Sequence, residues 1–279
     1  MITSLSLENF KSFKTLDNLR IKPLTILLGR NSCGKSSIIQ SLLLLKQTIS
    51  EENDSDLNVE GKYLKFSNLK DISYGVPKVN QAFIGYKIGV GNGIDFANIN
   101  IEFKNKKNEE SYVPTLNKFI YYNDKVNIDF MNINKNSLSN NMKDILLSIK
   151  KEKKFKDIQS NGKLETNFKN FMPNNVNLQG HKGFAFPMFI AFENILIDVF
   201  NQDLKKIKYL SPIRANPERI YIHYSNNALD ISENGGNSAH VLWSKKNETV
   251  EFDGKKIKLL DALHKSLEIL GLGQEITSE

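Results

Sequence analysis

Hydrophobic and polar residues alternate in the first ten positions of the chain. Leu5 and Leu7 are separated by a serine and followed by Glu8. This period of two predicts a half-buried β-strand over residues 2–10, because successive side chains of a strand point to opposite faces. A turn is expected at residues 9–13 and a second strand at residues 19–21. The continuous apolar run at residues 24–28, between Pro23 and Gly29, predicts a strand that is buried on both faces.

After the second glycine of the next turn, the pattern changes to the period of a helix. Apolar side chains recur at helical spacing over residues 36–48, at Ile38, Ile39, Leu42, Leu43 and Leu45. This stripe predicts a helix that packs within the protein. The acidic and polar residues 51–57 predict a loop after it.

The middle of the chain contains two further strand patterns and a region of different composition. Residues 81–88 and 96–103 alternate as antiparallel strands do, with the turn signal Gly91-Asn92-Gly93 between them. Residues 104–177 are rich in Asn and Lys, and we interpret them as an insertion with a helix at residues 142–149. A basic cluster follows that helix, at Lys150, Lys151, Lys153, Lys154 and Lys156. A solvated surface is the simplest interpretation of this cluster, and a DNA or RNA contact is the alternative.

The last hundred residues predict two helices and a short strand. Apolar spacing indicates a core helix over residues 188–200, and residues 207–210 indicate a strand. The final helix places Leu259, Leu263 and Leu267 on one face and ends before Gly271 and Gly273. The expected organisation is an N-terminal lobe (1–103), the insertion (104–177) and the remainder of the lobe (178–279).

Composition and charge narrow the class of protein. The 279 residues are 40% hydrophobic and 25% charged, which is typical of a globular chain and excludes collagen-like, coiled-coil and disordered classes. The net charge of +7 (38 − 31) favours anionic ligands without choosing among nucleotides, nucleic acid and acidic membranes.

Cysteine count and the apolar segments bear on the compartment. The single cysteine, Cys33, excludes an intramolecular disulfide and a cysteine-based zinc site, and it favours a reducing environment. The N-terminus lacks the pattern of a secretory signal. Residues 184–200 contain Pro187 and Glu193 and fall short of a membrane span. We therefore expect a cytoplasmic protein without a membrane partner.

One segment carries recognisable chemistry. It matches the phosphate-binding pattern G-x-x-x-x-G-K-[ST] with the residues Gly29, Arg30, Asn31, Ser32, Cys33, Gly34, Lys35 and Ser36. The two glycines permit a tight turn whose backbone N–H groups point at phosphate oxygens, and the helix that follows offers its positive end to the same anion. The predicted strand before the motif and the predicted helix after it are the context that such a loop requires.

The side chains of this loop have expected roles in binding ATP and Mg²⁺. Lys35 is the candidate catalytic residue, because its ammonium group can reach the β- and γ-phosphates. The Ser36 hydroxyl is the candidate Mg²⁺ ligand, and Ser37 is a further donor in the first helical turn. Cys33 is expected to fill space rather than act as a nucleophile.

Hydrolysis also needs an aspartate at the end of an apolar strand and a group that positions water. The nearest match is residues 195–198, ending at Asp198, but its apolar spacing is helical and we reject it. The four histidines are not spaced as in a metal-binding motif or a catalytic triad. They are His181, His223, His240 and His264.

The N-terminal forty residues resemble a known family. The segments 5–13 (LSLENFKSF) and 23–37 (PLTILLGRNSCGKSS) are similar to the start of ABC-type ATPase heads of the SMC, RecF and OLD kind, and most similar to OLD-like AAA-family ATPases. Residues 63–75, 210–215 and 270–273 are also similar to that group, although less specifically. The resemblance implies an α/β P-loop NTPase of ABC/SMC-head type, with a central sheet, flanking helices and an antiparallel β layer.

The resemblance also implies a mode of action. In such heads the nucleotide on one phosphate loop is capped by a signature motif from a second head, so a homodimer or larger assembly is expected, with an effector protein as a further possible partner. Lys11 in the Asn-Phe-Lys turn is a secondary candidate for a contact with the nucleotide, and Arg214 is a candidate functional cation. Each is equally consistent with a surface or ion-pairing role.

The chain departs from the family pattern in what it lacks. The signature motif, the Asp-Glu strand and the switch histidine of these relatives follow the region that resembles residues 271–279. We therefore expect either a fragment or a chain completed by another polypeptide, which binds ATP weakly and hydrolyses it poorly alone.

Three functions are consistent with the sequence. The leading hypothesis is an ATP-binding head that acts as a nucleotide-dependent switch in anti-phage defence or DNA maintenance. The alternative is a non-catalytic nucleic-acid-binding module with a regulatory nucleotide site. A small-molecule kinase or GTPase is the least favoured, because the chain has neither a base-specificity motif nor an acceptor-binding acid.

Overall fold

A computed structural model of the protein describes residues 1–50, 56–108, 111–124, 127–131, 164–178, 185–187, 196–216 and 231–272. The chain divides into two compact units, Met1–Ile207 and Lys208–Glu279, and each is described by itself. The domain boundaries expected at residues 104 and 178 both fall within the first unit.

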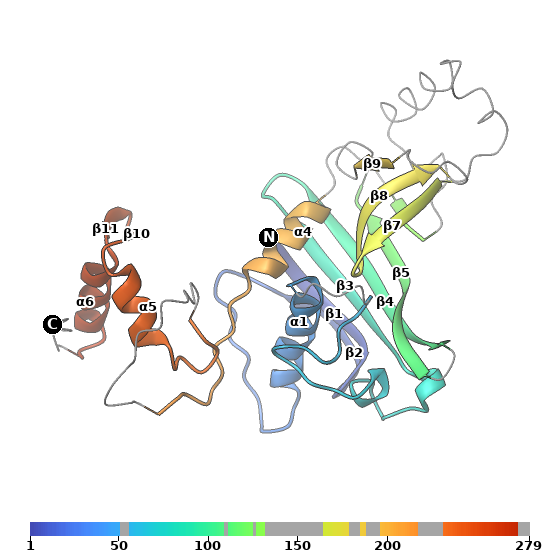
Figure 1. Ribbon diagram of the computed structural model, residues 1–279, viewed down its shortest axis with the longest axis horizontal. Coiled ribbons are helices and arrows are strands. Elements are labelled where there is room, and N and C mark those ends of the chain that lie inside the picture. Colours follow the sequence, from blue (N-terminus) through green and yellow to red (C-terminus); the bar gives the residue numbers. More distant parts are fainter. Residues whose placement is uncertain are drawn as a thin grey trace, which may run out of the picture. The chain divides into compact units, whose positions relative to one another are not determined.

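The first unit is built on a six-stranded sheet in which all neighbouring strands are antiparallel (Figure 1). The strand order is β2-β1-β3-β4-β5-β6. The bounds are Ile2–Phe10 for β1, Phe13–Arg20 for β2, Phe83–Gly91 for β3, Phe96–Asn108 for β4, Ser111–Tyr122 for β5 and Asn127–Asp129 for β6. A separate sheet contains β7 (Leu164–Lys169), β8 (Met172–Leu178) and β9 (Ala185–Pro187).

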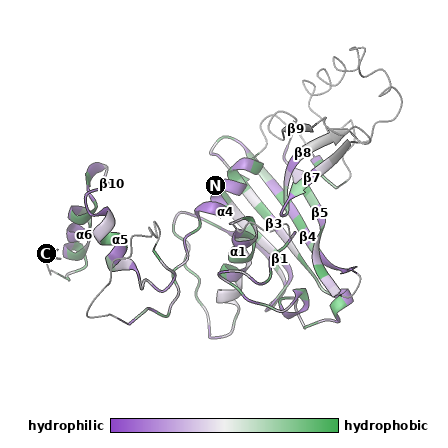
Figure 2. Ribbon diagram, viewed as in Figure 1, coloured by the Kyte–Doolittle hydropathy of each residue, from purple (hydrophilic) through white to green (hydrophobic). Residues whose placement is uncertain are grey.

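The first strand has the predicted bounds and the predicted alternation. Leu5, Leu7 and Phe10 are buried, whereas Glu8 is exposed on the opposite face. Figure 2 shows the same interleaving of hydrophobic and hydrophilic segments along the strands of the sheet. Aromatic side chains of neighbouring strands form a row on the buried face of the sheet. The ring centroids are 6.1 Å apart for Phe10 and Tyr86, and 6.4 Å apart for Tyr86 and Phe103.

The second strand is longer than the sequence predicted. It runs over residues 13–20 instead of 19–21, and residues Lys14, Asp17 and Arg20 along it are exposed. Because β2 lies at the edge of the sheet and pairs only with β1, charged side chains are tolerated there and hide the strand pattern. The strands predicted at residues 81–88 and 96–103 are confirmed as β3 and β4, and β4 continues through residue 104 to Asn108.

Two helices pack beside the sheet. The helix predicted at residues 36–48 is confirmed as α1 (Lys35–Ser50). Helix α4 (Ile197–Lys206) lies against α1 (Figure 1). Leu43, Leu44 and Leu45 of α1 are buried. The Tyr86 hydroxyl of β3 donates a hydrogen bond of 3.3 Å to a carbonyl of α1, and burial raises the pKa of this phenol. The helix is therefore fixed to the sheet by both apolar and polar contacts.

The predicted buried strand at residues 24–28 is wrong for the part of the chain that the structure describes. These residues form neither helix nor strand, and Leu24, Ile26 and Leu28 are 79%, 69% and 88% exposed. The last backbone bond to the sheet comes just before them, from the Ile21 N–H to the Thr3 carbonyl at 2.8 Å. A strand buried on both faces needs neighbours on its edges, and no described strand pairs with this segment. The described residues thus contain mixed α/β structure with a six-stranded antiparallel sheet, and the central sheet of ABC/SMC-head type that the resemblance implies stays a prediction.

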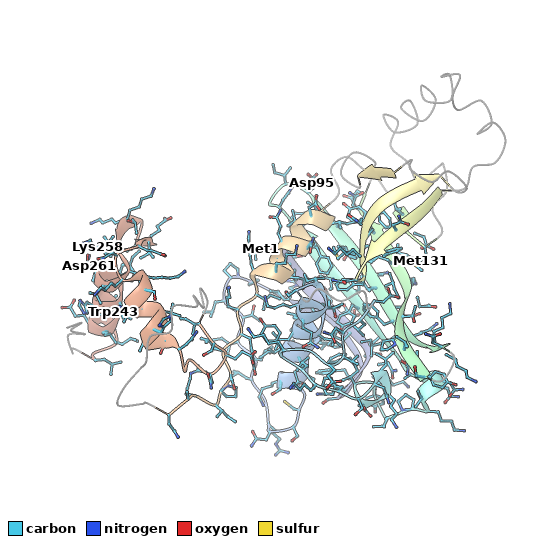
Figure 3. All side chains as sticks on the ribbon, viewed as in Figure 1. Met1, Asp95, Met131, Trp243, Lys258 and Asp261 are labelled. Atoms are coloured by element: carbon cyan, nitrogen blue, oxygen red, sulfur yellow. The ribbon has the colours of Figure 1, made fainter. Side chains whose placement is uncertain are left out.

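The second unit is a small α/β assembly. It contains α5 (Ser238–Lys245), the hairpin of β10 (Thr249–Phe252) and β11 (Lys255–Lys258), and α6 (Leu259–Ile269). Helix α6 confirms the predicted final helix, and Gly271 after it has a left-handed φ of +70°. Figure 3 shows Trp243 on α5 and Asp261 on α6. The strand predicted at residues 207–210 is not formed.

Several predictions lie outside the described residues. They are the helix at residues 142–149, the Lys150–Lys156 cluster, His181, His223, Gly273, residues 51–55 of the predicted loop and residues 188–195 of the predicted core helix. In the described part of the chain, no helix combines the length and the apolar character needed to cross a membrane. Asp198 lies in the first turn of α4, which confirms that residues 197–198 are helical.

Candidate nucleotide-binding site

The phosphate-loop motif forms a tight turn at the start of α1. Gly29, Ser32 and Gly34 have φ values of +155°, +63° and +96°. A Cβ atom on Gly29 would lie 2.7 Å from the Cys33 Sγ, and one on Gly34 would lie 2.6 Å from the Phe13 Cζ, so either substitution would force the neighbouring side chain to shift. The positive φ values are the stronger reason for glycine at both positions.

The Lys35 side chain folds back across this turn. Its ammonium group donates hydrogen bonds of 2.7 Å to the Gly29 carbonyl and 2.6 Å to the Arg30 carbonyl, and it lies 3.7 Å from the Cys33 Sγ. All three contacts are solvent-exposed. The positive charge is therefore held at an accessible position beside the loop, where an anion can reach it.

The N-terminal end of α1 adds a second source of positive potential. The first N–H groups of a helix have no partner within the helix, and here the earliest bond runs from the Ile38 N–H to the Gly34 carbonyl at 3.2 Å. No acidic side chain lies in the first turn. Loop, lysine and helix end together make an environment that attracts phosphate.

The two serines of the motif differ in their surroundings. Ser36 is exposed, whereas Ser37 is 7% exposed and its hydroxyl lies 3.3 Å from the Ser12 hydroxyl. Arg30, Asn31, Ser32 and Cys33 are exposed on the loop. Among the residues that the structure describes, no group of three or more His, Cys, Asp and Glu side chains could hold a metal ion.

Of the two secondary candidates, Lys11 contacts the side of α1. The Lys11 ammonium group donates a 2.7 Å hydrogen bond to the Gln40 Oε1 and lies 4.6 Å from the centre of the Phe66 ring. Burial lowers the pKa of this lysine. Because Gln40 is five residues beyond Lys35, about 7.5 Å along the helix axis, Lys11 braces the side of α1 in this structure. Arg214 is exposed and belongs to the second unit.

The sheet face that bears Glu8 carries a groove of about 340 Å³. Its charged lining residues have both signs, with Glu8, Asp17 and Glu102 beside Lys87 and Lys118. Nucleic-acid surfaces are dominated by positive charge, so this groove does not favour a DNA or RNA contact.

Sequence reasoning missed the residues that support the loop from the β1–β2 turn. Ser12 and Phe13 touch the motif, although only Lys11 of this turn was a candidate. The turn sequence Asn-Phe-Lys-Ser-Phe was visible, but its contact with residues more than twenty positions later was not.

Comparison with known proteins adds no relative: no family model, no curated protein and no solved structure matches the chain.

Proposed function

We propose that this chain binds Mg²⁺–ATP at residues 29–37 and acts as a nucleotide-dependent switch, as the head of an OLD/SMC-like ATPase does. One observation carries the proposal: the Lys35 ammonium group is held by the carbonyls of Gly29 and Arg30 at the open N-terminal end of α1. A cation fixed beside unpaired helix N–H groups is suited to the phosphates of a nucleotide.

Each part of the loop has a task in this proposal. The backbone N–H groups of residues 30–35 contact phosphate oxygens, and Lys35 moves toward the β- and γ-phosphates as a charge-assisted donor. Ser36, which is exposed at the first turn of α1, holds the Mg²⁺ ion that neutralises those phosphates. Gly29 and Gly34 keep side chains out of the space that the turn needs.

We further propose that ATP hydrolysis needs an additional polypeptide segment, and the exposed residues 24–28 support this. The apolar side chains of Leu24, Ile26 and Leu28 are all exposed, and their contact with water is unfavourable in free energy. A strand from elsewhere would cover them and bring the Mg²⁺-coordinating acid to the edge beside the loop. The complete ATPase is then a homodimer or larger assembly in the cytoplasm, with a role in anti-phage defence or DNA maintenance.

Calorimetric titration of Mg²⁺–ATP into the wild-type protein and Lys35→Ala tests the proposed function. The wild type is expected to bind and the variant to bind more weakly. Equal affinities would remove Lys35 from the site and the proposal with it.

A further inference from the structure

The β1–β2 turn contacts the phosphate loop and α1 at three regularly spaced points. Phe13 lies against Gly34, Ser12 against Ser37 and Lys11 against Gln40. The turn residues are consecutive, whereas their partners are three residues apart. Positions separated by three lie on one face of a helix, so the turn runs along a single side of the loop and the first two turns of α1.

The contact at Gly34 is the closest of the three. A Cβ atom on Gly34 would lie 2.6 Å from the Phe13 Cζ and 2.9 Å from its Cε2. The ring tip therefore occupies the space in which a side chain of the loop would stand. Gly34 is buried beneath an otherwise exposed loop, and Phe13 is half-buried.

Backbone hydrogen bonds hold the β1–β2 turn in place, so the turn can support the exposed phosphate loop. The Lys11 N–H donates to the Ile72 carbonyl at 2.7 Å, and the Tyr74 N–H donates to the Asn9 carbonyl at 3.0 Å. The positive φ values of Asn9 and Lys11, +55° and +47°, are held by this bonding. By contrast, residues 30–33 are exposed, and the Lys35 contacts to the loop lie in solvent.

We infer that Phe13 is a positioning residue that holds the phosphate loop in its binding conformation before the nucleotide arrives. Ordering a flexible loop costs conformational entropy, and a loop ordered in advance leaves more of the phosphate interaction for affinity. This inference rests on the proposed function, because it gives the turn a role in nucleotide binding.

Two substitutions perturb the contact in opposite directions. Phe13→Leu withdraws the ring tip from Gly34 and leaves the loop without support on this side. Phe13→Tyr adds a hydroxyl at Cζ, the ring atom closest to the Gly34 position, and pushes the loop outward. Phe96→Leu is the matched control, because Phe96 lies on the same sheet, is 64% exposed and pairs with Gly91 at the opposite end of β3 from Phe83.

Hydrogen exchange of the loop amides in nucleotide-free protein measures the positioning directly. Both Phe13 variants are expected to raise the exchange rate at residues 30–36 about fivefold or more, with protection of β3 and β4 unchanged. The Phe96→Leu control leaves the loop rates at the wild-type values. Unchanged loop exchange in both Phe13 variants would overturn the inference, even if the protein binds ATP.

Mg²⁺–ATP affinity of the same proteins separates this inference from the proposed function. The Phe13 variants are expected to bind about tenfold more weakly, since preorganisation is lost, while their thermal midpoints stay near that of Phe96→Leu. Faster loop exchange with unchanged affinity overturns the positioning role and leaves the nucleotide site in place. If the wild-type protein binds no ATP, the proposed function is overturned. In that case the hydrogen-exchange data still decide whether Phe13 orders the loop.

Discussion

The Lys46 ammonium group of α1 donates a 2.9 Å hydrogen bond to the Lys205 carbonyl in the last turn of α4. Lys46 is 5% exposed, and its ammonium group also lies 5.7 Å from the centre of the Tyr63 ring. A cation at the C-terminal end of a helix satisfies carbonyls that lack helical partners. The helix that begins at the phosphate loop is thereby fastened to the helix that ends where the first unit ends.

Lys46→Met is expected to lower the free energy of unfolding by about 1–3 kcal/mol, because the part-buried bond to the Lys205 carbonyl is lost while the apolar volume is kept. Chemical denaturation of the wild type and the variant measures this difference. Lys205→Met is the control, since the exposed Lys205 side chain is not the acceptor. A Lys46→Met protein as stable as Lys205→Met would show that the bond does not contribute to stability.

Gly34→Ala tests the contact between the loop and Phe13 against backbone strain alone. Gly34 and Gly93 have nearly the same φ, +96° and +95°, but a Cβ atom on Gly93 would meet nothing within 4 Å. Both substitutions should cost about 1–2 kcal/mol for the left-handed backbone. Only Gly34→Ala should also lose affinity for Mg²⁺–ATP in calorimetry. Equal loss of affinity in both variants would contradict the steric explanation.

The exposed segment 24–28 predicts an unusual insensitivity to substitution. Ile26→Ala should change the free energy of unfolding by no more than about 0.5 kcal/mol, as at other surface sites. The matched change Ile88→Ala removes a side chain that is 0% exposed and should cost about 2–5 kcal/mol. Urea unfolding of both variants gives the comparison. A cost at Ile26 similar to that at Ile88 would place residues 24–28 in a core.

The parts of the fold that were predicted correctly depend on local patterns. The alternation around Leu5 and Leu7 gave β1, and the helical apolar stripe gave α1 with its start at the phosphate loop. Gly29 and Gly34 were identified as necessary from the motif, and their positive φ values bear this out. Each of these features is encoded within about ten residues of sequence.

The parts that failed depend on distant neighbours. Residues 24–28 have the composition of a buried strand, but burial requires partner strands that the described residues do not supply. The predicted edge strand at residues 19–21 was shorter than β2, because the exposed charged side chains of β2 obscure the alternation of apolar and polar residues. The contact of Phe13 with Gly34 joins residues twenty-one positions apart, so no local period reports it.

The most direct test of the nucleotide site is a calorimetric titration of Mg²⁺–ATP into three proteins: wild type, Lys35→Ala and Lys22→Ala. Lys22 is an exposed lysine outside the motif and controls for general electrostatic attraction. The wild type and Lys22→Ala should bind alike, and Lys35→Ala should lose about 1.5–3 kcal/mol, the range for a charge-assisted hydrogen bond. That loss corresponds to an affinity about 10- to 150-fold weaker. Equal affinity of the wild type and Lys35→Ala, or no binding by the wild type, would contradict the account.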